Sequence, residues 1–246
     1  MKIESSVLDV LGNAATSGNG LVLKGELDRT MYVKVDKVLT LAGGKWNRKA
    51  KAHLFESDAS DIIDSLILTG EITDKKKEFD QFFSPKPVVA RALELAEIEN
   101  GMLAMEPSAG HGAIAIPMTE ITPRVDCVEL EPINADILRR HGLNVVQADF
   151  MELPPEVMYD RIVMNPPFSK QQDIKHVLHA YKFLKPGGVL VSVMSAGVEF
   201  RTNRLTTEFR DLVKSTGGVI ERLPEGSFLE SGTGIHTAIA VLHKED

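Results

Sequence analysis

Residues 103–112 read LAMEPSAGHG, a short apolar strand that runs directly into a glycine-rich turn. Gly110 and Gly112 allow the backbone to turn sharply and to approach a ligand closely. The turn does not have the G-x-G-x-x-G spacing, because Ala115 stands where the third glycine belongs, and no Gly-Lys-Ser/Thr of a P-loop follows. Glu106 at the strand end would repel a pyrophosphate. We therefore expect a cationic or amine-bearing ligand beside this turn.

Short apolar strands alternate with helical stretches around this turn. A helix is expected over Pro87–Ala96, with proline at its start. The expected strands are Leu103–Met105, Val125–Val128, Asn144–Gln147, Arg161–Met164, Gly188–Met194 and Thr237–Leu242. Such alternation predicts an α/β fold with a mostly parallel sheet and helices on both faces. Ligands of these sheets bind beyond the carboxyl ends of the strands.

The part of the chain before the sheet has a different pattern. Residues 73–80, TDKKKEFD, are charged and poor in apolar side chains, and we interpret them as a linker. Before them we expect a small α+β unit, with a strand at Leu21–Leu23, a helix at Arg29–Leu41 and a second helix capped by Asp58 or Ser60. We therefore expect two domains. Residues 1–78 form a small accessory domain, and residues 79–246 form the larger domain that contains the sheet.

Composition sets limits on the class of protein. The chain has 246 residues and a formal net charge of −7, which excludes a globally basic nucleic-acid coat. No apolar run approaches the ~18 residues that a membrane span needs, and the N-terminus does not have the pattern of a secretory signal, so we expect a cytoplasmic protein. The single cysteine, Cys127, excludes an internal disulfide and C-x-x-C zinc pairs, and the histidine spacing indicates no other metal site.

Two further acidic residues stand at the ends of predicted strands. Glu129 follows the second strand about 20 residues after the glycines, a spacing typical of an acid that holds ribose hydroxyls. Asp149 follows the third strand, where it could accept a hydrogen bond from an adenine amino group while Phe150 packs against the ring. A solvated strand end or an ordinary turn residue is the alternative interpretation of each acid.

Asn165-Pro166-Pro167-Phe168, directly after the predicted strand Arg161–Met164, is the most informative loop. Its two prolines stiffen the backbone and remove two N–H donors, so the loop offers carbonyl acceptors. The Asn165 side chain adds another carbonyl, and Phe168 adds an aromatic face. Such a loop suits a planar group that bears an NH₂, stacks on the ring and donates two hydrogen bonds.

In this order, the four motifs resemble class I S-adenosylmethionine-dependent methyltransferases. The Asn-Pro-Pro-Phe loop is similar to the Asn/Asp-Pro-Pro-Tyr/Phe motif of amino-group methyltransferases, mainly DNA adenine-N6 enzymes. Residues 81–85, QFFSP, resemble the Phe-x-Thr-Pro segment that precedes the glycine motif in those enzymes, and residues 223–228, LPEGSF, resemble a later segment whose aromatic residue packs on the flipped base. This motif order is that of the gamma class, and the resemblance covers residues 81–246.

The resemblance implies a Rossmann-like fold, S-adenosylmethionine as the cofactor, and methyl transfer to adenine N6 in DNA after base flipping. It assigns Glu129 to the ribose hydroxyls and Asp149, with Phe150, to the cofactor adenine. The residues that it places around the methionine part are Glu106, Ser108, Gly110, Gly112, Phe82, Phe83 and Ser84. The residues that it assigns to the reacting amine and the target base are Asn165, which also borders the cofactor, Pro166, Pro167, Phe168 and Phe228.

Target recognition requires a further element. Gamma-class enzymes usually carry a large recognition domain after the catalytic half, and this chain ends soon after its last predicted strand. We therefore expect recognition by the N-terminal unit, an inserted loop, another subunit or a second copy of the chain. Between Lys34 and His53, six cations stand against one carboxylate. The cations that we interpret as a phosphate-binding patch, with a solvated surface as the alternative, are Lys45, Arg48, Lys49 and Lys51.

Other functions stay open at this point. RNA adenine-N6, ribosomal guanine-N2 and protein glutamine-N5 methyltransferases also use Asn-Pro-Pro-aromatic loops, although glutamine enzymes usually have tyrosine at the position of Phe168. A nucleic-acid-binding module without catalytic activity is an alternative from a different class, and the intact motifs argue against it. Cytosine-C5 methylation is disfavoured, because Cys127 lies in a predicted core strand rather than on an exposed loop.

Overall fold

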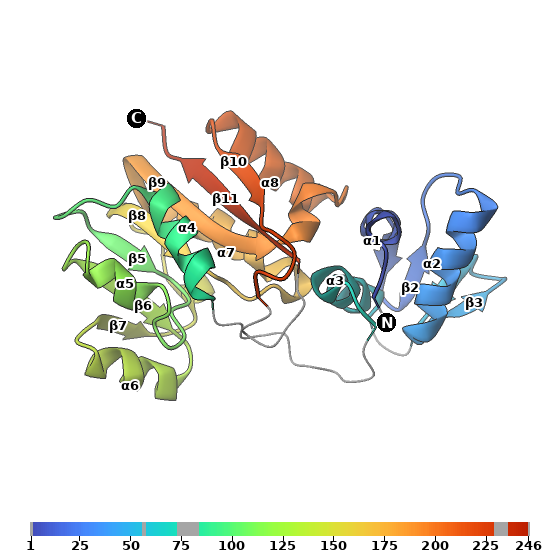
Figure 1. Cartoon of the computed structure of the whole chain (residues 1–246), viewed down its shortest axis with the longest axis horizontal. Helices are drawn as coiled ribbons and strands as arrows, with labels where there is room; N and C mark the ends of the chain where they lie inside the picture. The colour runs from blue at the N-terminus through green and yellow to red at the C-terminus, as the bar shows by residue number, and fades with distance from the viewer. Residues whose placement is uncertain (1, 56–57, 73–83, 229–235, 246) are drawn as a thin grey trace.

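The computed structural model describes residues 2–55, 58–72, 84–228 and 236–245. These residues form a smaller N-terminal unit and a larger unit that contains a long sheet (Figure 1). The predicted linker, residues 73–80, lies outside the described residues, so the exact domain boundary stays a prediction. In the described ranges no helix has the length and apolar character that crossing a bilayer requires.

The larger unit contains a seven-stranded sheet in the order β10-β11-β9-β8-β5-β6-β7. The strands from β7 to β9 in this order are parallel, and β11 pairs antiparallel with both β9 and β10. The bounds are β5 Ala104–Glu106, β6 Val125–Glu129, β7 Asn144–Gln147, β8 Tyr159–Met164, β9 Leu184–Ser195, β10 Val219–Arg222 and β11 Thr237–His243. The mostly parallel sheet predicted from the sequence is confirmed, and β10 is a strand that the sequence pattern did not indicate.

Helices cover both faces of this sheet, each with its own buried cluster. One cluster includes apolar side chains of α4, α5 and α6, and the other includes those of α7 and α8. The helix bounds are α4 Lys86–Ala96, α5 Ala115–Thr119, α6 Pro132–Arg140, α7 Gln172–Ala180 and α8 Arg204–Ser215, with short 3₁₀ turns η1 Phe150–Glu152, η2 Ser169–Gln171, η3 Tyr181–Phe183 and η4 Ala196–Glu199. This arrangement leaves the carboxyl ends of the parallel strands to the connecting loops, where the predicted motifs stand.

The N-terminal unit is the expected α+β unit, with a core of its own. Its four-stranded sheet has the order β1-β2-β4-β3, and its strand pairs are antiparallel. The bounds are α1 Ser5–Gly12, β1 Ala15–Ser17, β2 Gly20–Val22, α2 Arg29–Leu41, β3 Lys45–Asn47, β4 Ala52–Leu54 and α3 Ala59–Thr69. The two predicted helices are present, and the cation-rich stretch between them is a hairpin, β3–β4, rather than an irregular connection.

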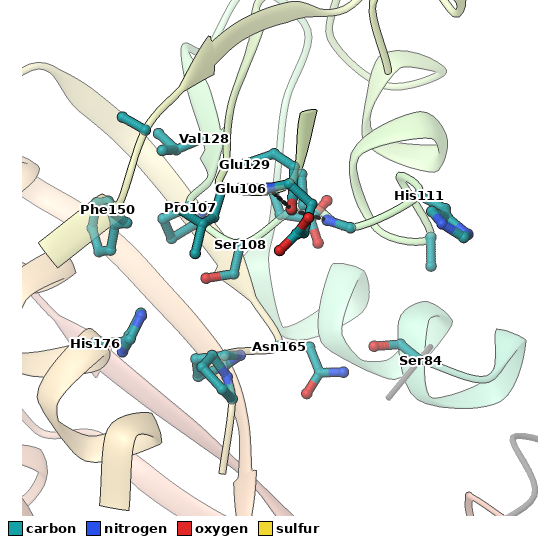
Figure 2. A pocket seen from close by; sticks show the side chains of 18 of the residues that line it. Ser84, Glu106, Pro107, Ser108, His111, Val128, Glu129, Phe150, Asn165 and His176 are labelled. Carbon is teal, nitrogen blue, oxygen red and sulfur yellow. Dashed lines mark hydrogen bonds between the residues drawn. The ribbon is translucent and has the colours of Figure 1, made fainter. Parts of the chain in front are cut away.

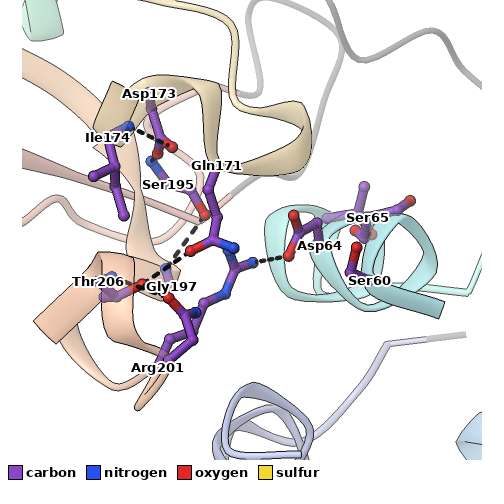
Figure 3. A network of polar contacts seen from close by, with 12 residues as sticks. Ser60, Asp64, Ser65, Gln171, Asp173, Ile174, Ser195, Gly197, Arg201 and Thr206 are labelled. Atoms are coloured by element: carbon purple, nitrogen blue, oxygen red, sulfur yellow. Dashed lines mark hydrogen bonds and ion pairs between the residues drawn. The ribbon is translucent and has the colours of Figure 1, made fainter. Parts of the chain in front are cut away.

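The N-terminal unit contacts the larger unit at the carboxyl edge of the sheet. Helix α3 packs against η2, which follows β8, and against η4, which follows β9. A buried ion pair joins the two units, because Arg201 Nη2 lies 2.7 Å from Asp64 Oδ1 on α3 (Figure 3). Phe200 also packs against the core of the N-terminal unit. The unit is therefore placed beside the loop that contains Asn165.

Asp173 on α7 gives this contact region a pH dependence. Its carboxylate accepts hydrogen bonds from the backbone N–H groups of Ser195 and Ile174 (Figure 3). Burial nevertheless raises the pKa of Asp173 to about 6, against the opposing effects of the Ser195 bond and the charge of Arg201. A raised pKa means that the folded protein binds the proton more tightly than the unfolded chain does. The acid therefore stabilises the folded state at pH values below the pKa of the unfolded chain, and this contribution is lost as the pH rises through the folded pKa.

We therefore expect this side chain to make the wild type more stable at pH 5 than at pH 7.5. Relative to an Asp173→Asn variant, the difference between these two pH values corresponds to about 1.4 kcal/mol in the free energy of unfolding. Urea unfolding of both proteins at several pH values measures it, and the comparison removes the contributions of other titrating groups. Parallel pH curves for the two proteins would contradict the assignment to Asp173.

Candidate functional site

A cavity of about 360 Å³ lies at the carboxyl edge of the parallel strands (Figure 2). Its walls come from the β5–α5 turn, the ends of β6 and β7, the loop after β8, and α7. The predicted site residues that line it are Ser84, Glu106, Ser108, Gly110, Glu129, Phe150, Asn165, Pro166, Pro167 and Phe168. Motifs that are far apart in the sequence thus face one cavity.

The β5–α5 turn forms one wall. Glu106 ends β5 with its side chain buried, and its Oε2 accepts a hydrogen bond of 2.6 Å from the Ala115 N–H. Burial raises the pKa of Glu106 well above its usual range. Gly110 has a φ of +53°, and a Cβ at this position would meet no heavy atom within 4 Å, so its backbone faces open space. Glu106 and Gly110 therefore give this wall a buried carboxyl group and an uncovered stretch of backbone.

Gly112 has a different role from the one expected. Its φ is +86°, and a Cβ there would lie 2.9 Å from side-chain atoms of both Ile116 and Leu138. Gly112 is not among the residues that line the cavity. It permits the turn and the close approach of the Ile116 and Leu138 side chains to this backbone, and its effect on a ligand is indirect.

Glu129 connects the turn to the next strand. Its Oε2 accepts a hydrogen bond of 2.7 Å from Gly110 N–H, and its Oε1 accepts one of 2.8 Å from Glu131 N–H and a longer one of 3.4 Å from Asn134 Nδ2. The side chain is buried in the protein but lies on the cavity wall. A carboxylate held by several donors keeps a defined orientation, which a ligand with paired hydroxyl groups requires.

The loop after β8 lies across the cavity from these acids. Figure 2 shows Asn165 on the side opposite Ser108 and Glu129. Pro166 and Pro167 have no N–H donors, so the backbone of this wall presents carbonyl oxygens. Phe168 is nearly fully buried and packs in the main core while it lines the cavity. This wall therefore accepts hydrogen bonds and is rigid.

Phe150 and His176 close the end of the cavity away from Ser84 (Figure 2). His176 Nδ1 lies 2.8 Å from the carbonyl oxygen of Gln172. Because a carbonyl only accepts, we assign the ring proton to Nδ1. Burial lowers the pKa of His176, so its Nε2 is an acceptor at neutral pH. His176 was not among the predicted site residues, because only the folding of α7 brings it to the cavity.

Several predicted residues stand elsewhere. Asp149 is exposed, does not line the cavity, and caps η1 by accepting a hydrogen bond of 2.8 Å from Met151 N–H. Phe228 is fully buried in the same cluster as Phe168 and presents no face to the cavity. Phe82 and Phe83 lie outside the described residues. The predicted cations of residues 45–51 lie on the β3–β4 hairpin rather than at the cavity.

A cysteine thiol or a bound metal ion would be a further source of chemistry among the described residues. Cys127 is fully buried in β6, and burial raises the pKa of its thiol, so it is no accessible nucleophile. Within the part of the chain that the structure describes, no group of three or more His, Cys, Asp or Glu side chains could hold a metal ion.

The cavity fits S-adenosylmethionine in three respects. The buried carboxyl of Glu106 and the open backbone of Gly110 form a polar end for an amino acid moiety. Glu129 lies on the wall where ribose hydroxyls would need an acceptor. Val128 and Phe150 provide apolar contact at the other end, where a purine ring would lie.

Comparisons with known proteins support this interpretation. Residues 98–217, just under half of the chain, match the family model of the methyltransferase small domain. A ribosomal RNA small subunit methyltransferase A of Chlorobium phaeobacteroides is 28% identical over 105 residues, which are 40% of this chain and 40% of that protein. The chain thus spans less than half the length of this curated relative.

Solved structures share the fold. A protein of Vibrio vulnificus YJ016, described as a modification subunit of a type I restriction enzyme, aligns with a TM-score of 0.56 and 19% identity over 76% of this chain and 49% of its own length. A dimethyladenosine transferase of Plasmodium falciparum aligns with a TM-score of 0.51 and 15% identity over 66% of this chain and 63% of its own. These comparisons confirm the Rossmann-like class I methyltransferase fold and, with the family match, support S-adenosylmethionine as the cofactor.

Proposed function

We propose that the protein transfers a methyl group from S-adenosylmethionine to the exocyclic N6 amine of adenine in DNA. The observation that carries this proposal is that the Glu106–Glu129 wall and the Asn165–Phe168 wall face each other across one cavity. One wall suits the cofactor, and the other suits a planar amine. A nucleic-acid-binding module without activity would have no need of both.

On the cofactor side, we assign the ribose hydroxyls to Glu129, the amino acid end to Glu106, Ser108 and Gly110, and the purine to Phe150. When bound, S-adenosylmethionine supplies a methyl group on a sulfonium, so the S–CH₃ bond breaks as the N6–CH₃ bond forms. Burial raises the pKa of the Glu106 carboxyl group. An ammonium group beside it would favour its ionised form.

Replacing Glu129 with alanine should weaken cofactor binding by about 100-fold, because two hydrogen bonds to a charged acceptor are lost. Isothermal titration calorimetry with S-adenosylmethionine measures the change. Glu131→Ala is the matched control, since Glu131 also lines the cavity but is exposed and does not cap α6 with its side chain. Equal affinities of the two variants would contradict the role given to Glu129.

On the substrate side, the adenine N6 lone pair is delocalised into the ring and is a poor nucleophile. The side-chain carbonyl of Asn165 and the backbone carbonyl of Pro166 accept hydrogen bonds from the two N6 protons and favour a pyramidal amine. The lone pair then becomes available for attack, and N6 releases one proton to solvent afterwards, so no strong base is needed. The protein contributes positioning and electrostatic stabilisation of the transition state.

A target adenine reaches this loop only after it leaves the base stack. Base flipping costs a few kcal/mol, and stacking on an aromatic side chain returns about 1–3 kcal/mol per base. We assign this stacking to Phe168, which lines the cavity. Phe228 would have to leave the core to take part, because it is fully buried.

RNA is the second candidate substrate. The curated relative is named as a ribosomal RNA methyltransferase, and one solved structure is a dimethyladenosine transferase. An adenine amine in RNA presents the same two N–H donors to Asn165 and Pro166. The chemistry of the site therefore does not distinguish an RNA substrate from a DNA substrate. The order of the motifs favours DNA. We also propose that a separate recognition subunit or a second copy of the chain contributes to target recognition.

A panel of acceptors tests the choice of substrate. The protein is incubated with radiolabelled S-adenosylmethionine and, in parallel, unmethylated duplex DNA, single-stranded DNA, ribosomal RNA and a release factor. We expect label in DNA. Label in RNA or in protein but not in DNA would contradict the proposed substrate while keeping the methyltransferase activity.

A further inference from the structure

We propose that the β3–β4 hairpin binds the phosphate backbone of DNA that flanks the target base, with the Trp46 ring contacting the nucleic acid. This inference rests on the proposed function for its choice of DNA. It adds a second contact surface, separate from the cavity, and assigns it to the N-terminal unit.

The hairpin is a concentrated positive surface on an acidic protein. Residues 45–54 contain four cations and no carboxylate, whereas the whole chain has a net charge of −7. Lys45, Arg48, Lys49 and Lys51 are all exposed. None of the four forms an ion pair with any residue that the structure describes. Their charges are therefore available to phosphates.

The hairpin turn holds these cations in a defined arrangement. Asn47 Oδ1 accepts hydrogen bonds of 3.0 Å from Lys49 N–H and 2.9 Å from Ala50 N–H. Lys51 has a φ of +50°, and the strands resume with Asn47 paired to Ala52. A side-chain acceptor and a left-handed residue close the turn. The cations thus project from an ordered backbone rather than from a loose segment.

Trp46 adds an aromatic surface to the same hairpin. The exposed fraction of Trp46 is 50%. Its ring meets His53 edge to face at a centroid distance of 5.1 Å, and His53 Nε2 lies 3.0 Å from Asp36 Oδ1. His53 is buried, so it supports the indole from the protein side. An indole held in this way gives a base or sugar a rigid face to pack on.

The position of the hairpin indicates which part of the DNA it contacts. Figure 1 shows β3 at the outer end of the N-terminal unit, with α3 between it and the larger unit. Helix α3 is held at the carboxyl edge of the large sheet by its packing on η2 and η4 and by the Asp64–Arg201 pair. The hairpin therefore lies away from the cavity, and it suits phosphates that flank the flipped base. It should affect DNA binding more than the rate of the chemical step.

The fluorescence of Trp46 tests this inference directly, because Trp46 is the single tryptophan of the chain. Titration with a short unmethylated duplex should quench or shift its emission, and salt should reverse the effect. Replacement of Lys45, Arg48, Lys49 and Lys51 by glutamine should weaken duplex binding by about 100-fold and lower the slope of log K against log salt by about 3 to 4. The variant should raise the KM for DNA, with kcat and cofactor affinity unchanged.

A control variant carries the same loss of charge at the opposite edge of the sheet. Arg139 and Arg140 end α6, Lys182 follows α7, and Lys214 lies in the last turn of α8. Because these helices run antiparallel to the strands, their carboxyl ends lie away from the cavity. All four are exposed, and their replacement by glutamine should leave the KM for DNA close to the wild-type value.

Failure of this inference differs from failure of the proposed function. If the wild type methylates DNA while Trp46 emission does not change, or if the two quadruple variants behave alike, the hairpin has no role in DNA binding. If a matched RNA duplex binds and DNA does not, the surface is assigned to the wrong nucleic acid. If the wild type neither binds nor methylates DNA, the proposed function itself fails.

Discussion

Replacing Asn165 with alanine is expected to lower the rate of methyl transfer by about 100- to 1,000-fold, with the affinity for S-adenosylmethionine nearly unchanged. Asn165 lies across the cavity from Glu129 and supplies a side-chain carbonyl for one of the two amine protons. Its loss removes an interaction that is strongest when the amine becomes pyramidal. The effect should therefore appear in kcat more than in binding. Single-turnover measurements with saturating cofactor and DNA report it.

Asn165→Asp is the matched control, because aspartate keeps a carbonyl-type acceptor at the same position. We expect this variant to retain more activity than the alanine variant. Calorimetry with the cofactor and circular dichroism check that both variants fold and bind. A wild-type rate for Asn165→Ala would show that the amine is held elsewhere and would contradict the proposed geometry.

The second large effect concerns stability. Replacing Asp64 with alanine is expected to lower the free energy of unfolding by about 3 kcal/mol, because Arg201 is left as a buried charge without its ion-pair partner. The two side chains lie 2.7 Å apart and are 11% and 6% exposed. Arg201 also packs over Gly197, where a Cβ would lie 2.7 Å from its Nε (Figure 3). The guanidinium therefore has little room to turn toward water.

Urea unfolding of Asp64→Ala measures this loss, and a double variant controls for it. Asp64→Leu combined with Arg201→Met removes both charges and keeps apolar volume, so we expect a stability close to that of the wild type. If Asp64→Ala were as stable as the wild type, the ion pair would not hold α3 on η4.

The sequence predicted the site best where a motif directly follows a strand. Glu106, Glu129 and Asn165 end or follow β5, β6 and β8, and parallel strands bring their carboxyl ends to one edge. Strand order is not needed for that inference. This is why the α/β fold and most residues of the cavity could be predicted from local patterns alone.

Predictions that required three-dimensional packing did less well. Phe228 matches a family segment, but packing in the core leaves it fully buried and away from the cavity. His176 reaches the cavity only through the position of α7. The Asp64–Arg201 pair joins residues from two units, and no local pattern indicates it. The β3–β4 hairpin was expected as a basic stretch, and its turn depends on the Asn47 side chain.

Identification of the methylated nucleoside tests the central proposal most directly. Unmethylated duplex DNA is incubated with labelled S-adenosylmethionine and either the wild type or Asn165→Ala, then digested to nucleosides and separated. We expect label in N6-methyladenine with the wild type and almost none with the variant. Label in N4-methylcytosine would contradict the assigned base. Absence of label from DNA, in a protein that binds the cofactor, would contradict DNA adenine methylation by this chain.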